Sequence, residues 1–210
     1  MTTILLIRHG STEWNDKRLA QGHADIPLND RGRREAKETA ASLSDRAIDA
    51  VYASDLSRAV ESARPLADAR NVVITADPDL REIDQGVWEG MHADEIERRW
   101  PDLWGRARHY HARPGGETPQ EVRARALRAL RRIVEAHPDA TVAVVSHGGT
   151  MRWLVAEAMG YDDRESARLR GVNNGGVVEL EVGARDGTLT FGDIKRHDGA
   201  TTAMEHDPNQ

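Results

Sequence analysis

The chain has 210 residues, no cysteine and a formal net charge of −6, with 39% hydrophobic and 30% charged residues. The absence of cysteine excludes disulfide scaffolds, thiolate metal centres and cysteine nucleophiles, and no apolar run is long enough to span a bilayer. The acidic balance argues against a general nucleic-acid binder. Because the N-terminus lacks the pattern of a signal peptide, we expect a cytoplasmic protein with no membrane partner.

Short apolar runs predict buried strands at residues 4–7, 50–53, 72–75 and 142–145. Residues 177–182 alternate more strongly. Together with residues 188–191 they predict a hairpin, because Gly183 and Gly187 flank the connection between the two runs.

Helical patterns lie between the predicted strands. Asn29 is placed to cap a helix that continues to about Leu43. Thr118 is placed to cap another, with Pro119 at the first helical position and Glu121 completing a capping box. The two remaining patterns cover residues 56–69 and the stretch between Gly149 and Gly160. Strands alternating with helices predict an α/β fold with a largely parallel sheet.

Residues 91–116 depart from this alternation. They contain a short helical stretch followed by Trp100, Trp104, Tyr110 and His111. We interpret the segment as an insertion over one end of the sheet. Residues 1–196 are then expected to form one domain, and the polar residues 197–210 a flexible tail.

Two of the predicted strands end in a histidine. Residues 4–7 lead into Arg8, His9 and a glycine, and residues 142–145 lead into Ser146, His147 and two glycines. Sites in parallel α/β sheets form beyond the carboxyl ends of the strands, so the two imidazoles can face each other there. The glycines allow a sharp turn and a close approach of a ligand to the main chain.

A cation at the start of a predicted helix adds to this pattern. Arg58 falls in the first turn of the helix after residues 50–53, where a positive charge opposes the helix dipole and a bound anion would offset it. Arginine forks match phosphate oxygens, so Arg8, Arg58, His9 and His147 together predict a phosphate-sized site.

This combination of residues suggests phosphoryl chemistry. A neutral imidazole can attack phosphorus while the other histidine and the arginines hold the transferring charge. Glu82 is a candidate proton donor to the leaving group, because a carboxyl beside a bound phosphate favours its protonated form. Taken singly, each residue has an ordinary interpretation as a strand-end histidine, a surface carboxylate or a salt-bridge arginine, and only the combination points to a site.

Several short motifs follow one another in a fixed order along roughly residues 3–182: Leu6-Ile7-Arg8-His9-Gly10-Ser11-Thr12-Glu13-Trp14-Asn15, Gln21-Gly22, Pro27-Leu28-Asn29, Ser54-Asp55-Leu56-Ser57-Arg58-Ala59, Glu82, Gly86-Val87-Trp88-Glu89-Gly90, Gly115-Gly116-Glu117-Thr118 and Ser146-His147-Gly148-Gly149. This series resembles the histidine phosphatase superfamily, whose other well-known branch is the cofactor-dependent phosphoglycerate mutases. The resemblance implies a three-layer α/β/α fold around a mostly parallel sheet, with a small helical insertion over the site.

The resemblance also implies a role for each matching residue. His9 corresponds to the nucleophile that becomes phosphorylated, and Glu82 to the proton donor that later activates water. Arg8, Arg58 and His147 would bind the phosphoryl group. The remaining positions, which would contact the substrate, are Asn15, Gln21, Gly22 and Gly148. The family needs no metal and no cofactor for this step.

Two positions depart from the family pattern. Ser11 stands where Glu or Gln is common, and Glu61 stands where Thr is common. Glu61 lies about one helical turn after Arg58, so we consider that it pairs with that arginine or tunes it.

The stretch from Arg81 to Gly90 resembles the phosphatase branch, and the insertion of about 25 residues is shorter than is typical of mutases. We therefore expect a phosphomonoesterase acting on a small phosphorylated metabolite. Substrate choice is expected within residues 91–116, where the basic residues would contact a second acidic group or would form a solvated face, and Trp100 and Trp104 would dock the insertion. The basic residues are Arg98, Arg99, Arg106, Arg108, His109, His111 and Arg113.

Three alternatives remain open at this point: a phosphoglycerate mutase, a non-catalytic module that binds phosphorylated ligands, and a metal-dependent hydrolase with His9 and His147 as ligands. A small phosphorylated substrate is the expected partner, and the resemblance allows a homodimer.

Overall fold

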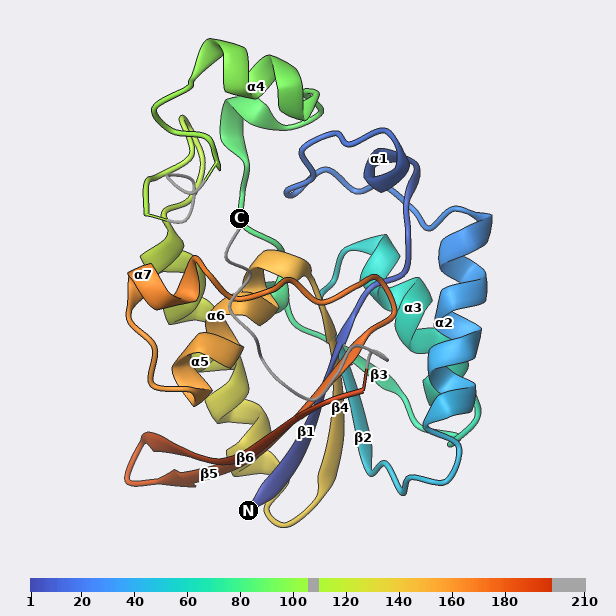
Figure 1. Ribbon diagram of the computed structural model, residues 1–210. Coiled ribbons are helices and arrows are strands. Elements are labelled where there is room, and N and C mark those ends of the chain that lie inside the picture. Colours follow the sequence, from blue (N-terminus) through green and yellow to red (C-terminus); the bar gives the residue numbers. More distant parts are fainter. Residues whose placement is uncertain (106–109, 198–210) are drawn as a thin grey trace.

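The computed structural model describes residues 1–105 and 110–197 (Figure 1). A mixed sheet of six strands lies at its centre, in the order β3-β2-β4-β1-β5-β6. The strands are β1 (Thr2–Arg8), β2 (Ala50–Ala53), β3 (Ile74–Ala76), β4 (Thr141–Ser146), β5 (Val177–Arg185) and β6 (Thr188–Arg196). Strands β3, β2, β4 and β1 are parallel, whereas β5 is antiparallel to β1 and β6 is antiparallel to β5. This confirms the mostly parallel sheet and the terminal hairpin.

The central strands bury side chains on both faces, as continuous apolar runs predict. In β1, Ile4 and Leu6 belong to one hydrophobic core, and Leu5 and Ile7 belong to the other. Helices α5 (Pro119–Ala136) and α6 (Gly148–Ala158) cover the first face; α2 (Asp30–Ser42) and α3 (Ser57–Asp68) cover the second (Figure 1). The layers confirm the three-layer α/β/α fold.

Local capping signals placed two helices correctly. The Asn29 side chain accepts a hydrogen bond from the Gly32 amide at 2.8 Å and starts α2. Thr118 and Glu121 form the predicted reciprocal capping box of α5. Both signals act within four residues, so they did not need tertiary information.

Strand β3 begins two residues later than its apolar run predicted. Asn71 takes a positive φ of 52°, and the Val72 amide donates to the carbonyl of Ala67 at 3.1 Å, so Val72 belongs to the end of α3. The short elements α1 (Glu13–Asp16), η1 (Pro78–Leu80), η2 (Gly86–Trp88) and α7 (Asp163–Ser166) lie in stretches that showed no periodic pattern.

The predicted insertion contains α4 (Ala93–Arg99) and lies beyond the carboxyl ends of the parallel strands (Figure 1). Its anchor is the buried Trp88, whose ring contacts those of Trp100 and Trp104 at centroid distances of 6.2 and 5.6 Å. The two tryptophans therefore dock the segment, as expected. Residues 106–109 and the expected tail from 198 onward lie outside the described residues, so the predictions for Arg106, Arg108 and His109 do too. Across residues 1–105 and 110–197, no helix combines the length and apolarity that a bilayer span requires.

Helix α2 packs its first turn directly against the loop that follows β1. A Cβ atom built on Gly32 would lie 2.1 Å from the Ser11 carbonyl oxygen, and one built on Gly10 would lie 2.4 Å from the Gly32 carbonyl oxygen. Both neighbouring atoms belong to the main chain, so neither can move away unless the backbone rearranges. Glycine at these two positions lets the helix hold the loop that carries His9.

We predict that Gly32→Ala lowers the free energy of unfolding by about 2 to 3 kcal/mol, because the added methyl group overpacks this contact. Urea denaturation measures the change. Gly171→Ala is the matched control, since a Cβ there meets its nearest atom at an ordinary 3.9 Å. A Gly32→Ala protein as stable as the control would contradict this account of the contact.

Candidate active site

The two strand-end histidines face each other across the β1–β4 pair. Arg8 lies opposite Ser146 in the parallel register, so His9 and His147 are the next residues of adjacent strands. Their ring centroids are 5.0 Å apart with an interplanar angle of 58°. His9 is 3% exposed and His147 is fully buried. The structure thus brings together the pair that the sequence suggested.

The surroundings of His9 specify its tautomer. Nδ1 lies 2.7 Å from the carbonyl oxygen of Gly10, which can only accept, so Nδ1 carries the proton and Nε2 keeps its lone pair. The main chain of His9 is fixed as well: its amide donates to the Ser146 carbonyl, and its carbonyl accepts from Asn174 Nδ2 at 2.9 Å. A neutral imidazole with an available Nε2 is the nucleophilic form of histidine.

His147 has the opposite tautomer. Arg58 Nε donates to His147 Nδ1 at 3.3 Å, so the proton of the ring lies on Nε2. That Nε2 is buried and has no hydrogen-bond partner among the described residues. A buried N–H donor without a partner is costly, and an anion bound beside it would remove the cost.

Both imidazoles are held neutral. Burial, followed by the charges of Arg8 and Arg58, lowers the pKa of His9 well below its usual range. Burial, followed by the charge of Arg58, lowers the pKa of His147 in the same way.

Arg58 is fully buried in the first turn of α3. Its Nη1 donates to the carbonyl of Ala24 at 2.9 Å and its Nη2 to the carbonyl of Gly22 at 2.7 Å. Burial lowers the pKa of this guanidinium to about 10, so the group stays charged at neutral pH. Main-chain carbonyls hold the cation in place and leave its positive charge available to an anion.

Arg8 lies beside the N-terminus of α6, with its Nε 3.3 Å from a Cβ built on Gly148. Its Nη1 donates to the carbonyl of Val172 at 2.7 Å, while its Nε is buried without a partner among the described residues. Arg8 and His147, the residue that precedes α6, therefore each present one unfilled N–H donor near the same helix end. This arrangement fits a tetrahedral oxyanion.

Glu82 also reaches the N-terminus of α6. Its Oε2 accepts from the Gly149 amide at 3.0 Å, and its Oε1 accepts from the Ile83 amide at 2.9 Å. The carboxyl group thus lies at the same helix end as Arg8 and His147, where a group that protonates a departing oxygen is needed.

A cavity of about 260 Å³ opens in front of this arrangement. Arg8 and Glu82 line it, whereas His9, Arg58 and His147 are buried and are not among its lining residues. The lining residues are Arg8, Ala20, Glu82, Ile83, Gln85, Trp104, Arg113, Gly148, Gly149, Arg152, Trp153 and Gly171.

The other predicted substrate contacts are placed less directly. Asn15 uses its side-chain oxygen in the capping box of α1, accepting from Thr12. Gln21 accepts from the Thr12 hydroxyl, and its Nε2 is buried without a partner among the described residues. Gly22 donates its amide to Glu89 and accepts from Arg58, so its main chain positions that arginine.

The two departures from the family pattern have structural explanations. Buried Ser11 accepts from Arg31 and donates to Glu35 at 2.9 Å, which links the loop after β1 to α2. The expected pairing of Glu61 with Arg58 is wrong: Glu61 lies 3.5 Å from Arg33 Nε on the neighbouring helix α2. Packing of α3 against α2 turns the Glu61 carboxylate away from the site.

The sequence analysis assigned no role to a second group of residues around the site, although Glu117 stands in one of the ordered motifs. Arg125 and Glu117 hold the main chain beside Glu82, and Asn174 holds that of His9. Arg152 also lines the cavity, and its place one helical turn after Gly148 was a usable signal. Arg125 gave no local signal, because an arginine in an amphipathic helix looks like a solvated residue.

The basic residues of the insertion divide between the two expected interpretations. Arg98, Arg99 and His111 are exposed, and Arg99 pairs with Glu95 at 2.6 Å. Arg113 is buried and lines the cavity, with its guanidinium 5.7 Å from the centre of the Trp88 ring. Nowhere in the part of the chain that the structure describes do three His, Asp or Glu side chains gather in a metal-binding group.

Known proteins share this architecture. The family described as histidine phosphatase superfamily (branch 1) matches residues 4–193. The uncharacterized phosphatase PhoE of Bacillus subtilis is 35% identical over 170 residues, which cover 80% of this chain and 84% of PhoE. The probable phosphoglycerate mutase GpmB of Enterobacter sp. is 35% identical over 173 residues, covering 81% of this chain and 80% of GpmB. The solved structure of Bacillus stearothermophilus YhfR matches with a TM-score of 0.86 and 33% identity, covering 98% of this chain and 100% of YhfR.

We predict that His9 and His147 stay neutral in the folded protein as the pH falls through the range in which an ordinary histidine is protonated, because their pKa values are lowered. Long-range ¹H–¹⁵N correlation spectra of the imidazoles, assigned with His9→Gln and His147→Gln, report both charge and tautomer. In the urea-unfolded chain the same rings should titrate near the ordinary value of 6.5. The unfolded state then binds the extra protons, so the stabilising contribution is complete above about pH 6.5 and is lost as the pH falls. Protonation of either ring near pH 6.5 in the folded protein would contradict the assignment.

Proposed function

The chain belongs to the histidine phosphatase superfamily, and from that premise we propose that it is a phosphomonoesterase that works through a phosphohistidine on His9. The observation that carries the proposal is the combination of a neutral His9, whose Nε2 is available, with two buried donors that lack partners, Arg8 Nε and His147 Nε2. Arg58 adds a buried positive charge beside them. A phosphoryl group supplies the acceptor oxygens that these donors need.

In the first step, His9 Nε2 attacks phosphorus and the P–O bond to the leaving group breaks. The electron pair of that bond passes to the leaving oxygen, which takes the proton of Glu82 and departs as an alcohol. Arg8, Arg58 and His147 stabilise the charge on the non-bridging oxygens during the transfer. Because the two histidines are neutral beforehand, the nucleophile needs no prior deprotonation.

In the second step, the Glu82 carboxylate takes a proton from water, and the resulting oxygen nucleophile attacks the phosphohistidine. The P–N bond breaks and its electron pair returns to Nε2, which restores the starting imidazole. Inorganic phosphate leaves, and Glu82 is again protonated for the next cycle. Neither step needs a metal ion.

We favour hydrolysis over mutase chemistry because the stretch from Arg81 to Gly90 resembles the phosphatase branch and the insertion is short. A mutase must shield its phosphohistidine from water and return the phosphoryl group to the same molecule. The name of the GpmB relative keeps the mutase as the second candidate, and conversion of 3-phosphoglycerate to 2-phosphoglycerate in the presence of a bisphosphoglycerate primer distinguishes it.

The leaving group would occupy the part of the cavity that runs from Glu82 to Arg113 and Trp104. A volume of about 260 Å³ suits a small metabolite. Arg113 is held over the Trp88 ring, so its charge is already in position for an acidic group of the substrate.

We predict that the wild-type protein releases phosphate from 4-nitrophenyl phosphate in the presence of EDTA and that His9→Ala lowers the rate by about 10³-fold or more, because the nucleophile is lost. A phosphate-release assay measures both rates. Equal rates would show that His9 is not the nucleophile. Loss of wild-type activity with EDTA would favour the metal-dependent alternative.

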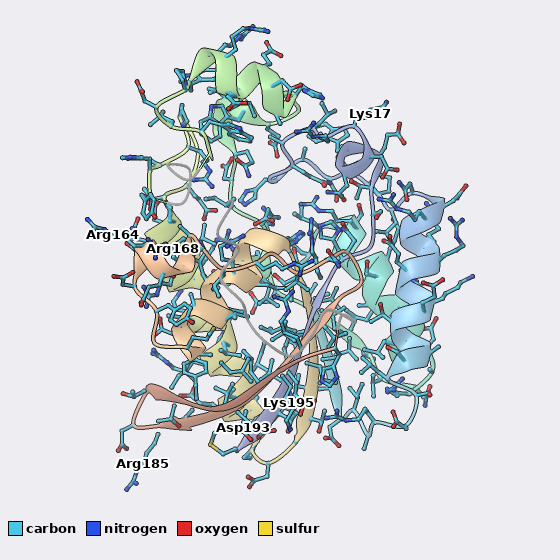
Figure 2. The ribbon with its side chains drawn as sticks, viewed as in Figure 1. Lys17, Arg164, Arg168, Arg185, Asp193 and Lys195 are labelled. Carbon is cyan, nitrogen blue, oxygen red and sulfur yellow. The ribbon has the colours of Figure 1, made fainter. Side chains whose placement is uncertain are left out.

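We predict that Arg113→Met lowers kcat/KM for 3-phosphoglycerate about tenfold, since one charge-assisted contact is lost. The rate with glycerol 3-phosphate, which replaces the carboxylate with a hydroxymethyl group, should change less than threefold. Arg185→Gln is the control for net charge, because its side chain is 91% exposed and points away from the molecule at the tip of the β5–β6 hairpin (Figure 2). Equal losses for both substrates would indicate that Arg113 only supports the cavity wall.

A further inference from the structure

Glu82 follows η1 in an irregular segment, where side chains rather than a helix or strand ladder bond the main-chain carbonyls. Thr150 Oγ1 donates to the carbonyl of Arg81 at 2.6 Å, and His23 Nε2 lies 2.9 Å from that of Glu82. One guanidinium bonds three of these carbonyls: Arg125 Nη1 donates to the carbonyls of Asp79 and Arg81 at 2.9 and 2.6 Å, and Arg125 Nη2 donates to that of Glu82 at 2.7 Å. Arg125 reaches this segment from the middle of α5. Main-chain groups that are buried outside regular structure require such partners.

Glu117 completes the arrangement from the other side. Its two carboxylate oxygens accept from Arg125 Nε and Nη2, each at 2.8 Å. The same carboxylate accepts from the Asp84 amide at 2.9 Å. Burial alone would raise the pKa of Glu117, but the hydrogen bonds from Arg125 and Asp84 outweigh it and hold the pKa below its usual value. Hydrogen bonds therefore hold the main chain on both sides of Glu82, the residue that carries the reacting carboxyl group.

The burial of Arg125 makes this arrangement more than a surface ion pair. Its side chain is only 9% exposed, whereas Arg128 and Arg132 on the same helix are more than half exposed. A buried guanidinium is tolerated when its donors are all directed to acceptors, and the planar fork fixes the angle of each bond. An ammonium group could keep the charge but could not reach three carbonyls and a carboxylate at once.

We propose that Arg125 and Glu117 form a positioning pair that sets the Glu82 carboxyl group at the distance from the leaving oxygen that proton transfer requires. This inference rests on the proposed function of Glu82 as proton donor. The carboxyl group itself is fixed to α6 through the Gly149 amide, and Arg125 fixes its main chain to α5. The position of the Glu82 carboxyl group therefore depends on how α5 packs against α6.

Proton transfer gives this role a specific kinetic signature. The donor must approach the leaving oxygen to about 2.6–3.2 Å, and a displacement of about 1 Å can cost two orders of magnitude in rate. An alkoxide leaves poorly without a proton, whereas 4-nitrophenolate is a weak base and leaves without one. The second step is common to all substrates, but kcat/KM reports only the steps up to departure of the leaving group. A displaced Glu82 should therefore lower kcat/KM for alkyl phosphates and spare kcat/KM for 4-nitrophenyl phosphate.

The test compares kcat/KM for glycerol 2-phosphate and 4-nitrophenyl phosphate in Arg125→Lys, Glu82→Gln and the double variant. Arg125→Lys keeps a positive charge beside Glu117 and removes the planar guanidinium group that bonds the main-chain carbonyls. Arg123→Lys is the matched control: it lies two residues earlier on α5 and pairs with Glu157, on the side away from Glu82. Thermal unfolding of each variant accompanies the kinetics. If Arg125→Lys does not unfold cooperatively, Glu117→Gln replaces it.

We expect Arg125→Lys to lower kcat/KM for glycerol 2-phosphate by about ten- to a hundredfold and kcat/KM for 4-nitrophenyl phosphate by less than about threefold. Arg123→Lys should leave both rates within about twofold of wild type. In the double variant, Arg125→Lys should cause no further loss beyond Glu82→Gln, because the position of an absent acid no longer matters.

Equal losses with both substrates, or losses that add fully to those of Glu82→Gln, would overturn the positioning role and leave a purely structural one. If Glu82→Gln itself lacks the dependence on leaving group, the assignment of Glu82 as proton donor fails instead. The two failures are therefore distinguishable in one set of measurements.

Discussion

The register between β1 and β4 is the constraint on which the site depends. Arg8 lies opposite Ser146, and this alignment brings the two following imidazoles to 5.0 Å. A shift by one residue would send every side chain of β1 to the other face of the sheet, and both hydrophobic cores would lose their packing. The alternation of β1 side chains between the two hydrophobic cores therefore also fixes the relative position of His9 and His147. A site built on strand ends in this way has little freedom to distort unless the core distorts too.

Burial then decides the chemistry of these residues. Removing water from His9 and His147 keeps both rings neutral, and the hydrogen bonds to Gly10 and from Arg58 give them opposite tautomers. The same desolvation leaves donors on Arg8 and His147 unfilled, at a cost of about 1–3 kcal/mol each that an anionic ligand removes. Unpaired donors that lower the stability of the folded protein contribute binding energy when a ligand pairs with them, which is a common relation between folding and function.

Glu82, the proposed acid, differs from His9, the proposed nucleophile, in how the fold holds it. His9 continues a strand, so the sheet places it directly, whereas Glu82 lies in an irregular segment between β3 and α4. Its position depends on the α6 terminus and on Arg125, a residue 43 positions away in the sequence. Irregular segments can carry such groups only when neighbouring elements satisfy their main chain, and here one buried arginine fork bonds three of the carbonyls.

The sequence by itself determined the features that act over a few residues. Apolar runs located the central strands, the capping box located α5, and the ordered motifs identified the strand-end histidines, both arginines and Glu82 as candidates. Only the tertiary structure decided which of their atoms are free to react, since that depends on partners such as Gly10 and Val172. It also turned Glu61 toward Arg33 and directed Arg125 inward, results that no local pattern encodes. The reason is physical: caps and periodicity act within one or two turns of chain, whereas the partner of a buried polar group depends on how helices dock across the sheet.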